Sequence, residues 1–129
     1  MLIGSVANTI AERLAQTNDE AGFAMSLVCD ASGLLLASAG DSADQDNLAA
    51  LTSLFEDIVY RSRRDLGIPA VDEVSMVDPE WGRLVIRPLP IQIDSQLFLV
   101  VRLGHRQTWR RYTNRLKREL EALFDRGES

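Results

Sequence analysis

The sequence predicts an α+β domain whose elements follow the order helix, two strands, helix, three strands, helix. Apolar residues recur at helical spacing in three separate segments, and short apolar runs separated by turn residues lie between them. No repeat or long linker divides the chain, and 129 residues suffice for a single domain with its own core. We therefore expect one domain spanning residues 1–129.

The N-terminal part of the chain predicts a helix followed by a β-hairpin. Apolar residues at three- and four-residue steps predict the helix over residues 2–16. Two apolar runs, Met25–Cys29 and Leu34–Ala39, then predict paired strands. We expect Asp30 and Gly33 to serve the turn between them, because the carboxylate can accept hydrogen bonds from amides ahead of it and glycine tolerates positive φ.

A second amphipathic helix is predicted over residues 45–66. Ser42 or Asp44 is expected to cap its start, and Gly67 and Pro69 end it. Its apolar residues are Leu48, Leu51, Leu54, Phe55, Ile58 and Val59. In one interpretation this surface packs only on the sheet. In the other it is too wide for a single contact and also serves a second chain, because contiguous exposed apolar surface marks interfaces.

Three strands are predicted in the second half of the chain. The first lies within residues 71–77 and the second over Leu84–Arg87. Pro88 and Pro90 then suit an edge strand or a bulge better than a central ladder, because proline has no N–H to donate. The third strand, Gln96–Leu103, is apolar almost throughout, which predicts a central strand covered on both faces.

The C-terminal helix is expected to begin near Arg106 and carries basic residues outside its apolar face. Acidic residues are interleaved with them, so pairs four residues apart, such as Arg115–Glu119 and Lys117–Glu121, are expected to neutralise a solvated face. The whole chain has a formal charge of −5, which disfavours binding to the phosphates of nucleic acids. We expect no nucleic-acid partner.

Residues that carry enzyme chemistry are scarce. His105 is the only histidine and Cys29 the only cysteine, so neither a zinc-type site nor a nucleophile–base pair can be assembled. Asp41, Asp44 and Asp46 do not complete a calcium loop, because threonine stands where the final glutamate belongs. The phosphate-binding pattern G-x-x-x-x-G-K-S/T is absent. The expectation is a protein that is not an enzyme and uses no cofactor or metal.

Cellular location is predicted from cysteine usage and from the hydropathy pattern. A single cysteine cannot form an internal disulfide, which fits a reducing compartment. The first residues lack the basic and long apolar regions of a signal peptide, and no apolar run has the length needed to span a bilayer. We expect a cytoplasmic protein with no integral membrane association.

The pattern resembles the Roadblock/LC7 family, which includes MglB-like and dynein-light-chain proteins. The element order matches over the whole chain, and residues 28–38 resemble the family's first hairpin, an apolar strand leading into D-x-x-G and a second apolar strand. The helix containing Asn47–Leu51 stands where the family's second helix would. Gln96–Leu103 followed by Gly104 resembles the last strand before the final helix.

This resemblance implies a five-stranded antiparallel sheet with helices on both faces, in a profilin-like layout. It also implies a homodimer in which the sheets join edge to edge through the third strand and the second helices lie side by side. Bacterial relatives regulate small Ras-like GTPases, some as GTPase-activating proteins without an arginine finger and others as scaffolds. An absence of catalytic residues fits that mode of action.

The expected function is therefore a non-catalytic homodimeric regulator that binds a small Ras-like GTPase and modulates its GTP hydrolysis. The alternative is a structural adaptor with no effect on hydrolysis, and a third hypothesis is a small-ligand sensor of the PAS or GAF type. Arg61, Arg63 and Arg64 either steer an acidic partner or act as cations at a helix C-terminus. The residues expected at the dimer and partner interface are Leu48, Leu51, Leu54, Phe55 and Ile58.

Overall fold

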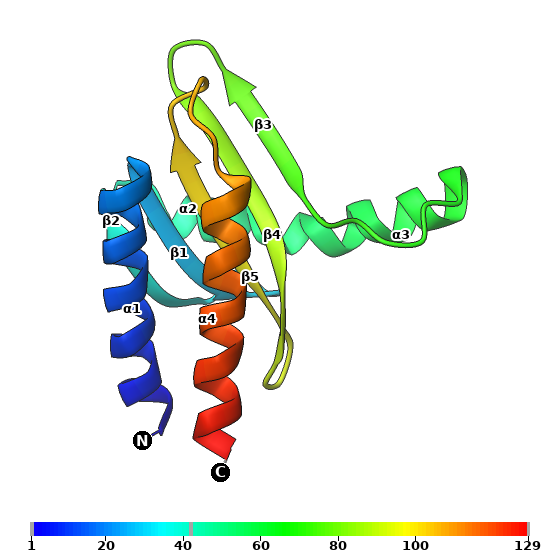
Figure 1. Cartoon of the computed structure of the whole chain (residues 1–129). Coiled ribbons are helices and arrows are strands. Elements are labelled where there is room, and N and C mark those ends of the chain that lie inside the picture. The colour runs from blue at the N-terminus through cyan, green and yellow to red at the C-terminus, as the bar shows by residue number, and fades with distance from the viewer. Residues whose placement is uncertain (1, 42, 129) are drawn as a thin grey trace.

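The computed structural model describes the backbone of residues 2–41 and 43–128 and the side chains of residues 4–41 and 43–125. Figure 1 shows the helices arranged around one sheet. In chain order the elements are α1 (Leu2–Ala21), β1 (Met25–Asp30), β2 (Leu35–Gly40), α2 (Gln45–Leu51), the 3₁₀ helix η1 (Thr52–Leu54), α3 (Phe55–Leu66), β3 (Val74–Asp78), β4 (Gly82–Gln92), β5 (Gln96–Leu103) and α4 (Arg110–Glu128).

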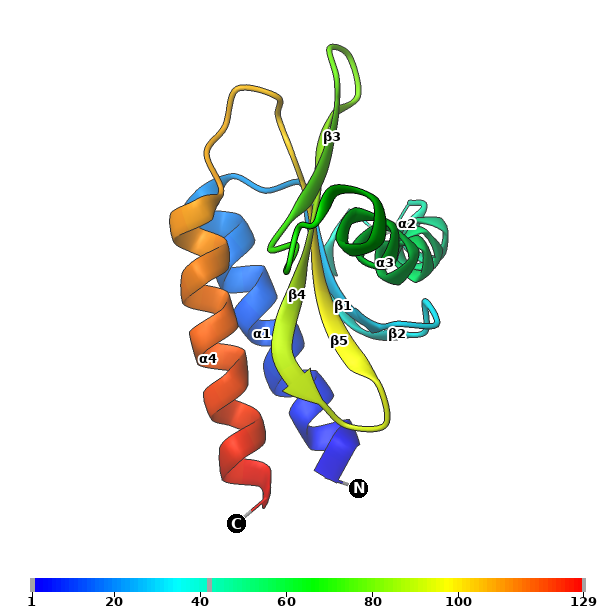
Figure 2. The same ribbon diagram turned by 90° about the vertical axis from the view of Figure 1, so that its right-hand side faces the viewer.

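The five strands form one antiparallel sheet in the order β2-β1-β5-β4-β3. Helices α1 and α4 cover one face, and α2 and α3 lie on the other (Figure 2). Each face has its own apolar core, because side chains alternate between the two faces along a strand. The predicted α+β class, element order and antiparallel sheet are confirmed.

Strand β5 lies at the centre of the sheet, as its continuous apolar sequence predicts. Leu99 and Val101 pack in the core beneath α1 and α4, whereas Phe98 and Val100 pack in the core beneath α2 and α3. Both faces of β5 are therefore buried, and the polar alternation of a half-exposed strand is missing for that reason.

The turn between β1 and β2 has the chemistry that its sequence predicts. The Asp30 carboxylate accepts hydrogen bonds from the backbone N–H groups of Ser32 (2.9 Å) and Leu34 (3.0 Å) and from the Ser32 hydroxyl. These bonds, with the Ser32 hydroxyl contributing most, hold the pKa of Asp30 below its ordinary value. Gly33 closes the turn at a φ of 88°. Both residues serve the hairpin.

Strand β4 is an internal strand over its first half only. It pairs with β3 as far as Ile86, which lies opposite Val74, and its pairing with β5 becomes irregular between Pro88 and Gln92. Pro88 and Pro90 have no N–H to donate, so this part of β4 cannot form a complete ladder of hydrogen bonds. The irregularity predicted at the two prolines is confirmed.

Two helix boundaries differ from the predictions. Helix α1 continues to Ala21, because Thr17 and Asn18, which suggested a polar break, are buried, and the helix ends at Gly22 with a φ of 76°. Helix α4 begins only at Arg110. The Gln107 side chain holds the preceding loop by bonding the backbone of both Gly104 and Gly22.

Candidate interaction surface

The second predicted helix is a broken helix of three parts: α2, η1 and α3. The break begins at Thr52, which is fully buried and whose hydroxyl lies 3.4 Å from the Cys29 sulfur. The Ser53 hydroxyl donates to the carbonyl of Ala50 at 2.8 Å. Hydroxyls that bond to backbone and core groups in this way compete with the regular helical ladder and favour a tighter 3₁₀ turn.

The start of α2 does not have the predicted cap, whereas the end of α3 does. Asp44 occupies the cap position with a φ of 66°, but its side chain makes no capping hydrogen bond. Ser42 lies outside the described residues. At the other end, Gly67 adopts a left-handed φ of 70° and its N–H bonds the carbonyl of Arg63, so glycine ends the helix as predicted.

The expected interface residues separate into two groups. Leu48 and Phe55 are 7% and 3% exposed, and the Phe55 ring packs 5.1 Å from the ring of Phe98 on β5. These two residues pack on the sheet, and their assignment to an interface stays a prediction. Leu51, Leu54 and Ile58 are 39%, 56% and 39% exposed, and we call this set the apolar flank.

The apolar flank is one side of α3 and its preceding turn. Successive helical residues are rotated by about 100°, so Leu54 and Ile58 point roughly opposite to Glu56 and Arg63. Phe55 lies between these directions and points at the sheet. The helix therefore offers two separate lateral surfaces, one apolar and one with mixed charge.

The three arginines that follow the apolar flank are exposed and engaged locally. Arg61 Nε lies 3.0 Å from an Asp57 carboxylate oxygen, and Arg64 pairs with Asp65 at 2.8 Å. Arg63 donates to the carbonyl of Pro69 at 3.0 Å. Their positions fit the favourable placement of cations at a helix C-terminus, and a steering role stays a prediction.

A free sheet edge accompanies the apolar flank. β3 is the last strand of the sheet and pairs only with β4 among the strands that the structure describes. Met76 lies opposite Leu84, so it shares the face covered by α2 and α3, and it is half exposed. The outer end of α3, with the exposed Tyr60 and Leu66, projects past this edge (Figure 1). The free edge of β3 and the apolar flank of the helix thus leave apolar side chains exposed.

A buried arginine, which the sequence analysis did not single out, fixes the connection from α3 to β3. Arg87 on β4 is 3% exposed and lies 2.6 Å from a carboxylate oxygen of Asp72 in that connection. Its guanidinium also donates to Thr113 (2.8 Å) and Asn114 (2.6 Å) on α4. Lys117 lies 3.4 Å from Asp72 rather than beside Glu121, although the predicted pair Arg115–Glu119 forms at 3.5 Å.

A second carboxylate extends the Arg87 network. Glu73 accepts a 2.8 Å hydrogen bond from the indole N–H of Trp109 and lies 3.7 Å from both Arg87 and Arg110. The network joins α4 on one face of the sheet to the segment that positions α3 and β3. The signal in the sequence was an arginine within the apolar run of β4.

Cys29 and His105, the one cysteine and the one histidine of the sequence, lie in separate parts of the described structure. Burial raises the pKa of the Cys29 thiol to about 11, so the thiol is packed and protonated. His105 lies exposed in the loop before α4. Among the described residues, no group of three His, Cys, Asp or Glu side chains could hold a metal ion. None of the described helices has the length and apolar character needed to cross a bilayer.

Solved structures share this arrangement of strands and helices. MglB of Myxococcus xanthus superposes with a TM-score of 0.75, covering 93% of this chain and 90% of its own, at 19% identity. An MglB in a tetrameric arrangement gives 0.74 over 95% and 92%, at 18% identity. A Roadblock/LC7 domain from Streptomyces avermitilis gives 0.63 over 88% and 89%, at 17% identity. The chain has the Roadblock/LC7 fold.

The resemblance seen in the sequence is thus confirmed for the fold. No family model and no curated protein matches the sequence. Because a Roadblock/LC7 fold, like any fold, hosts more than one function, the role of this chain has to be argued from its own surface.

Proposed function

We propose that this protein is a homodimeric regulator that binds a small Ras-like GTPase and modulates its GTP hydrolysis without supplying a catalytic side chain. The observation that carries the proposal is the apolar flank beside a free β3 edge. Both features leave groups exposed that a second copy can cover: apolar side chains, and unpaired backbone N–H and C=O groups.

The arrangement of the apolar flank and the free β3 edge supports the association of two copies about a two-fold axis. Two β3 strands can pair antiparallel, which extends the sheet, and the projecting end of α3 then lies over the partner's sheet. Met76 and the apolar flank are on the same face, so one contact can bury both. One MglB structure has a tetrameric arrangement, which is consistent with self-association on this fold.

The dimer is tested by the molar mass in solution, measured by light scattering or sedimentation. We expect a dimer for the wild type and a monomer for Leu54→Asp, which places a charge in the contact. Leu34→Asp is the matched control, because Leu34 is as exposed but lies in the β1–β2 turn. A wild-type monomer at micromolar concentration contradicts the dimer.

The regulatory part of the proposal is tested with the small Ras-like GTPases encoded by the same genome. Each is loaded with GTP, and phosphate release is measured with and without this protein. A change in the hydrolysis rate of one of them supports regulation. Binding without a change in rate supports the alternative, a structural adaptor, and the absence of binding to all of them removes the GTPase from the proposal.

A further inference from the structure

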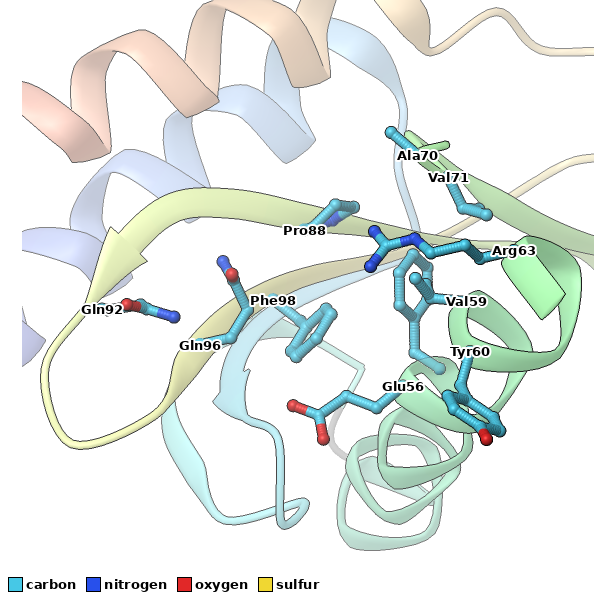
Figure 3. Close-up of a pocket in the computed structure, with 11 residues that line it drawn as sticks. Glu56, Val59, Tyr60, Arg63, Ala70, Val71, Pro88, Gln92, Gln96 and Phe98 are labelled. Carbon is cyan, nitrogen blue, oxygen red and sulfur yellow. The ribbon is translucent and has the colours of Figure 1, made fainter. Parts of the chain in front are cut away.

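A groove runs along the side of α3 that faces away from the apolar flank. It has a volume of about 380 Å³, is open to solvent rather than enclosed, and lies between α3 and the ends of β4 and β5 (Figure 3). Phe98, Val59 and Pro88 form its apolar floor. The volume is in the range of ligand sites, and the open shape fits a segment of chain better than a small molecule.

The groove and the apolar flank are separate surfaces. Glu56, Val59 and Arg63 line the groove and recur at steps of three and four residues, so they form one side of α3. Leu54 and Ile58 lie on the opposite side and do not line the groove. A second copy seated on the apolar flank leaves the groove accessible.

Two opposite charges face the groove. The Glu56 carboxylate and the Arg63 guanidinium both point toward it (Figure 3). Neither makes an ion pair with another described residue, although Arg63 also donates to the carbonyl of Pro69. Glu56 and Arg63 are seven positions apart in the helix, which corresponds to about 10 Å along the axis of α3. An occupant complementary to the groove therefore carries a basic group and an acidic group at comparable separation.

The neighbouring strand edge favours an extended occupant. Beyond Ile86, no described strand pairs with β4 on its outer side, and Ala70 and Val71 of the connection before β3 line the groove beside Pro88, so an extended segment can lie along this part of the edge. Pro88 and Pro90 have no backbone N–H, so they cannot donate hydrogen bonds to a segment bound at this edge. The exposed Gln92 side chain, which points toward the groove, can supply donors instead (Figure 3).

We propose that this groove binds an extended segment of a partner protein in which an apolar side chain lies between a basic and an acidic residue. Side chains on one face of an extended chain alternate, and positions i and i+4 lie about 13 Å apart. The corresponding spacing between Glu56 and Arg63 along α3 is about 10 Å. The Arg63 side chain is long and flexible enough to make up this difference. The segment thus has the pattern basic-x-apolar-x-acidic or its reverse.

The test uses the full-length protein and three fluorescent peptides: Ser-Lys-Ser-Leu-Ser-Glu-Ser, the same peptide with Lys and Glu exchanged, and a neutral peptide with Gln at both positions. We expect one charge order to bind roughly 5- to 10-fold more tightly than the other two, the effect of two partly exposed ion pairs. In the double variant Glu56→Lys/Arg63→Glu the preferred order should reverse. Equal affinities, or a preference that the double variant retains, overturn the proposal.

The matched control is Asp57→Arg/Arg61→Asp, because this opposite-charge pair also lies on α3 but does not line the groove. It should leave the peptide preference unchanged, and a reversal there contradicts the assignment. Val59→Glu should abolish peptide binding while the dimer mass and the helical circular dichroism are kept. If Val59→Glu or the peptide dissociates the dimer, the groove is occupied by the second copy and the proposal fails.

Discussion

Arg87 on β4 and Asp72 in the connection before β3 lie 2.6 Å apart, guanidinium nitrogen to carboxylate oxygen. The arginine is buried, whereas the carboxylate reaches it from the surface. The pair holds the segment between α3 and β3 against α4. The position of the proposed interaction surfaces therefore depends on a contact made on the opposite face of the sheet.

Removal of the Asp72 carboxylate should destabilise the protein. In Asp72→Ala the buried guanidinium loses its shortest charged partner, and we expect the free energy of unfolding to fall by about 1–3 kcal/mol. Urea unfolding followed by circular dichroism measures this change. In the control Asp65→Ala, which removes an exposed pair with Arg64, the change should stay within about 0.5 kcal/mol. Equal losses in both variants contradict the importance of the buried pair.

The stability of the protein should decrease in acid. Burial opposes ionisation of Asp72, but the hydrogen bond and charge of Arg87 and the charge of Lys117 outweigh it, so the pKa lies below its ordinary 3.8. A carboxyl whose pKa is lowered by folding stabilises the folded state above the unfolded-state pKa. That contribution is lost as the pH falls through the folded-state pKa, so we expect a decline between about pH 5 and pH 2.

The contribution of this one group can be isolated with Asp72→Asn. Its unfolding free energy should depend less steeply on pH over the same range, because the carboxyl that gains protons on unfolding is absent. Asp30 and Asp78 also have lowered pKa values, owing mainly to the Ser32 hydroxyl and to the backbone N–H of Trp81, so some pH dependence remains. If the unfolding free energies of the wild type and Asp72→Asn depend equally on pH, the role assigned to Asp72 is ruled out.

The Cys29 thiol should react slowly in the folded protein. A pKa raised from 9.0 to about 11 lowers the thiolate fraction about 100-fold near neutral pH, and complete burial slows access further. Reaction with a chromogenic disulfide at pH 8 measures the rate, and the same reaction in concentrated urea gives the reference. Comparable rates in both conditions would show that the thiol is accessible.

Gly33→Ala and Gly67→Ala should lower the free energy of unfolding by different amounts, although both glycines have positive φ. A Cβ at Gly67 meets no atom within 4 Å, so we expect only the left-handed penalty of about 1–2 kcal/mol. A Cβ at Gly33 would lie 3.0 Å from Cα of Ala50 on α2, which adds overpacking, for a total of roughly 2–4 kcal/mol. Urea unfolding of both variants tests the order, and a smaller loss in Gly33→Ala contradicts it.

The sequence predicted the element order and the central strand because these depend on local patterns. The apolar run of β5 indicates a strand buried on both faces, and Asp30 and Gly33 indicate a turn, without knowledge of any distant residue. The break at Thr52 could not be predicted, because it depends on contact with Cys29, which is 23 residues away in the sequence. The Arg87 network was missed for the same reason, since its partners come from two other elements.

The interface prediction shows the same limit. Apolar spacing placed Leu48, Leu54 and Phe55 on one helix, but periodicity does not reveal which of them the sheet covers. The 3₁₀ turn at η1 changes the rotation of the helix between α2 and α3, and with it the direction of each side chain. The exposed set could be separated from the core set only with the strands in place.

The central position of β5 also has a consequence for the order in which the chain folds. β1 and β2 form one hairpin and β3 and β4 another, and β5 joins them, with Met25 opposite Arg102. On the ribosome, both hairpins emerge before residues 96–103, so each waits with an uncovered edge until the last strand arrives. Contacts this distant in sequence slow folding, and a nascent chain stalled before β5 exposes the surfaces most prone to aggregation.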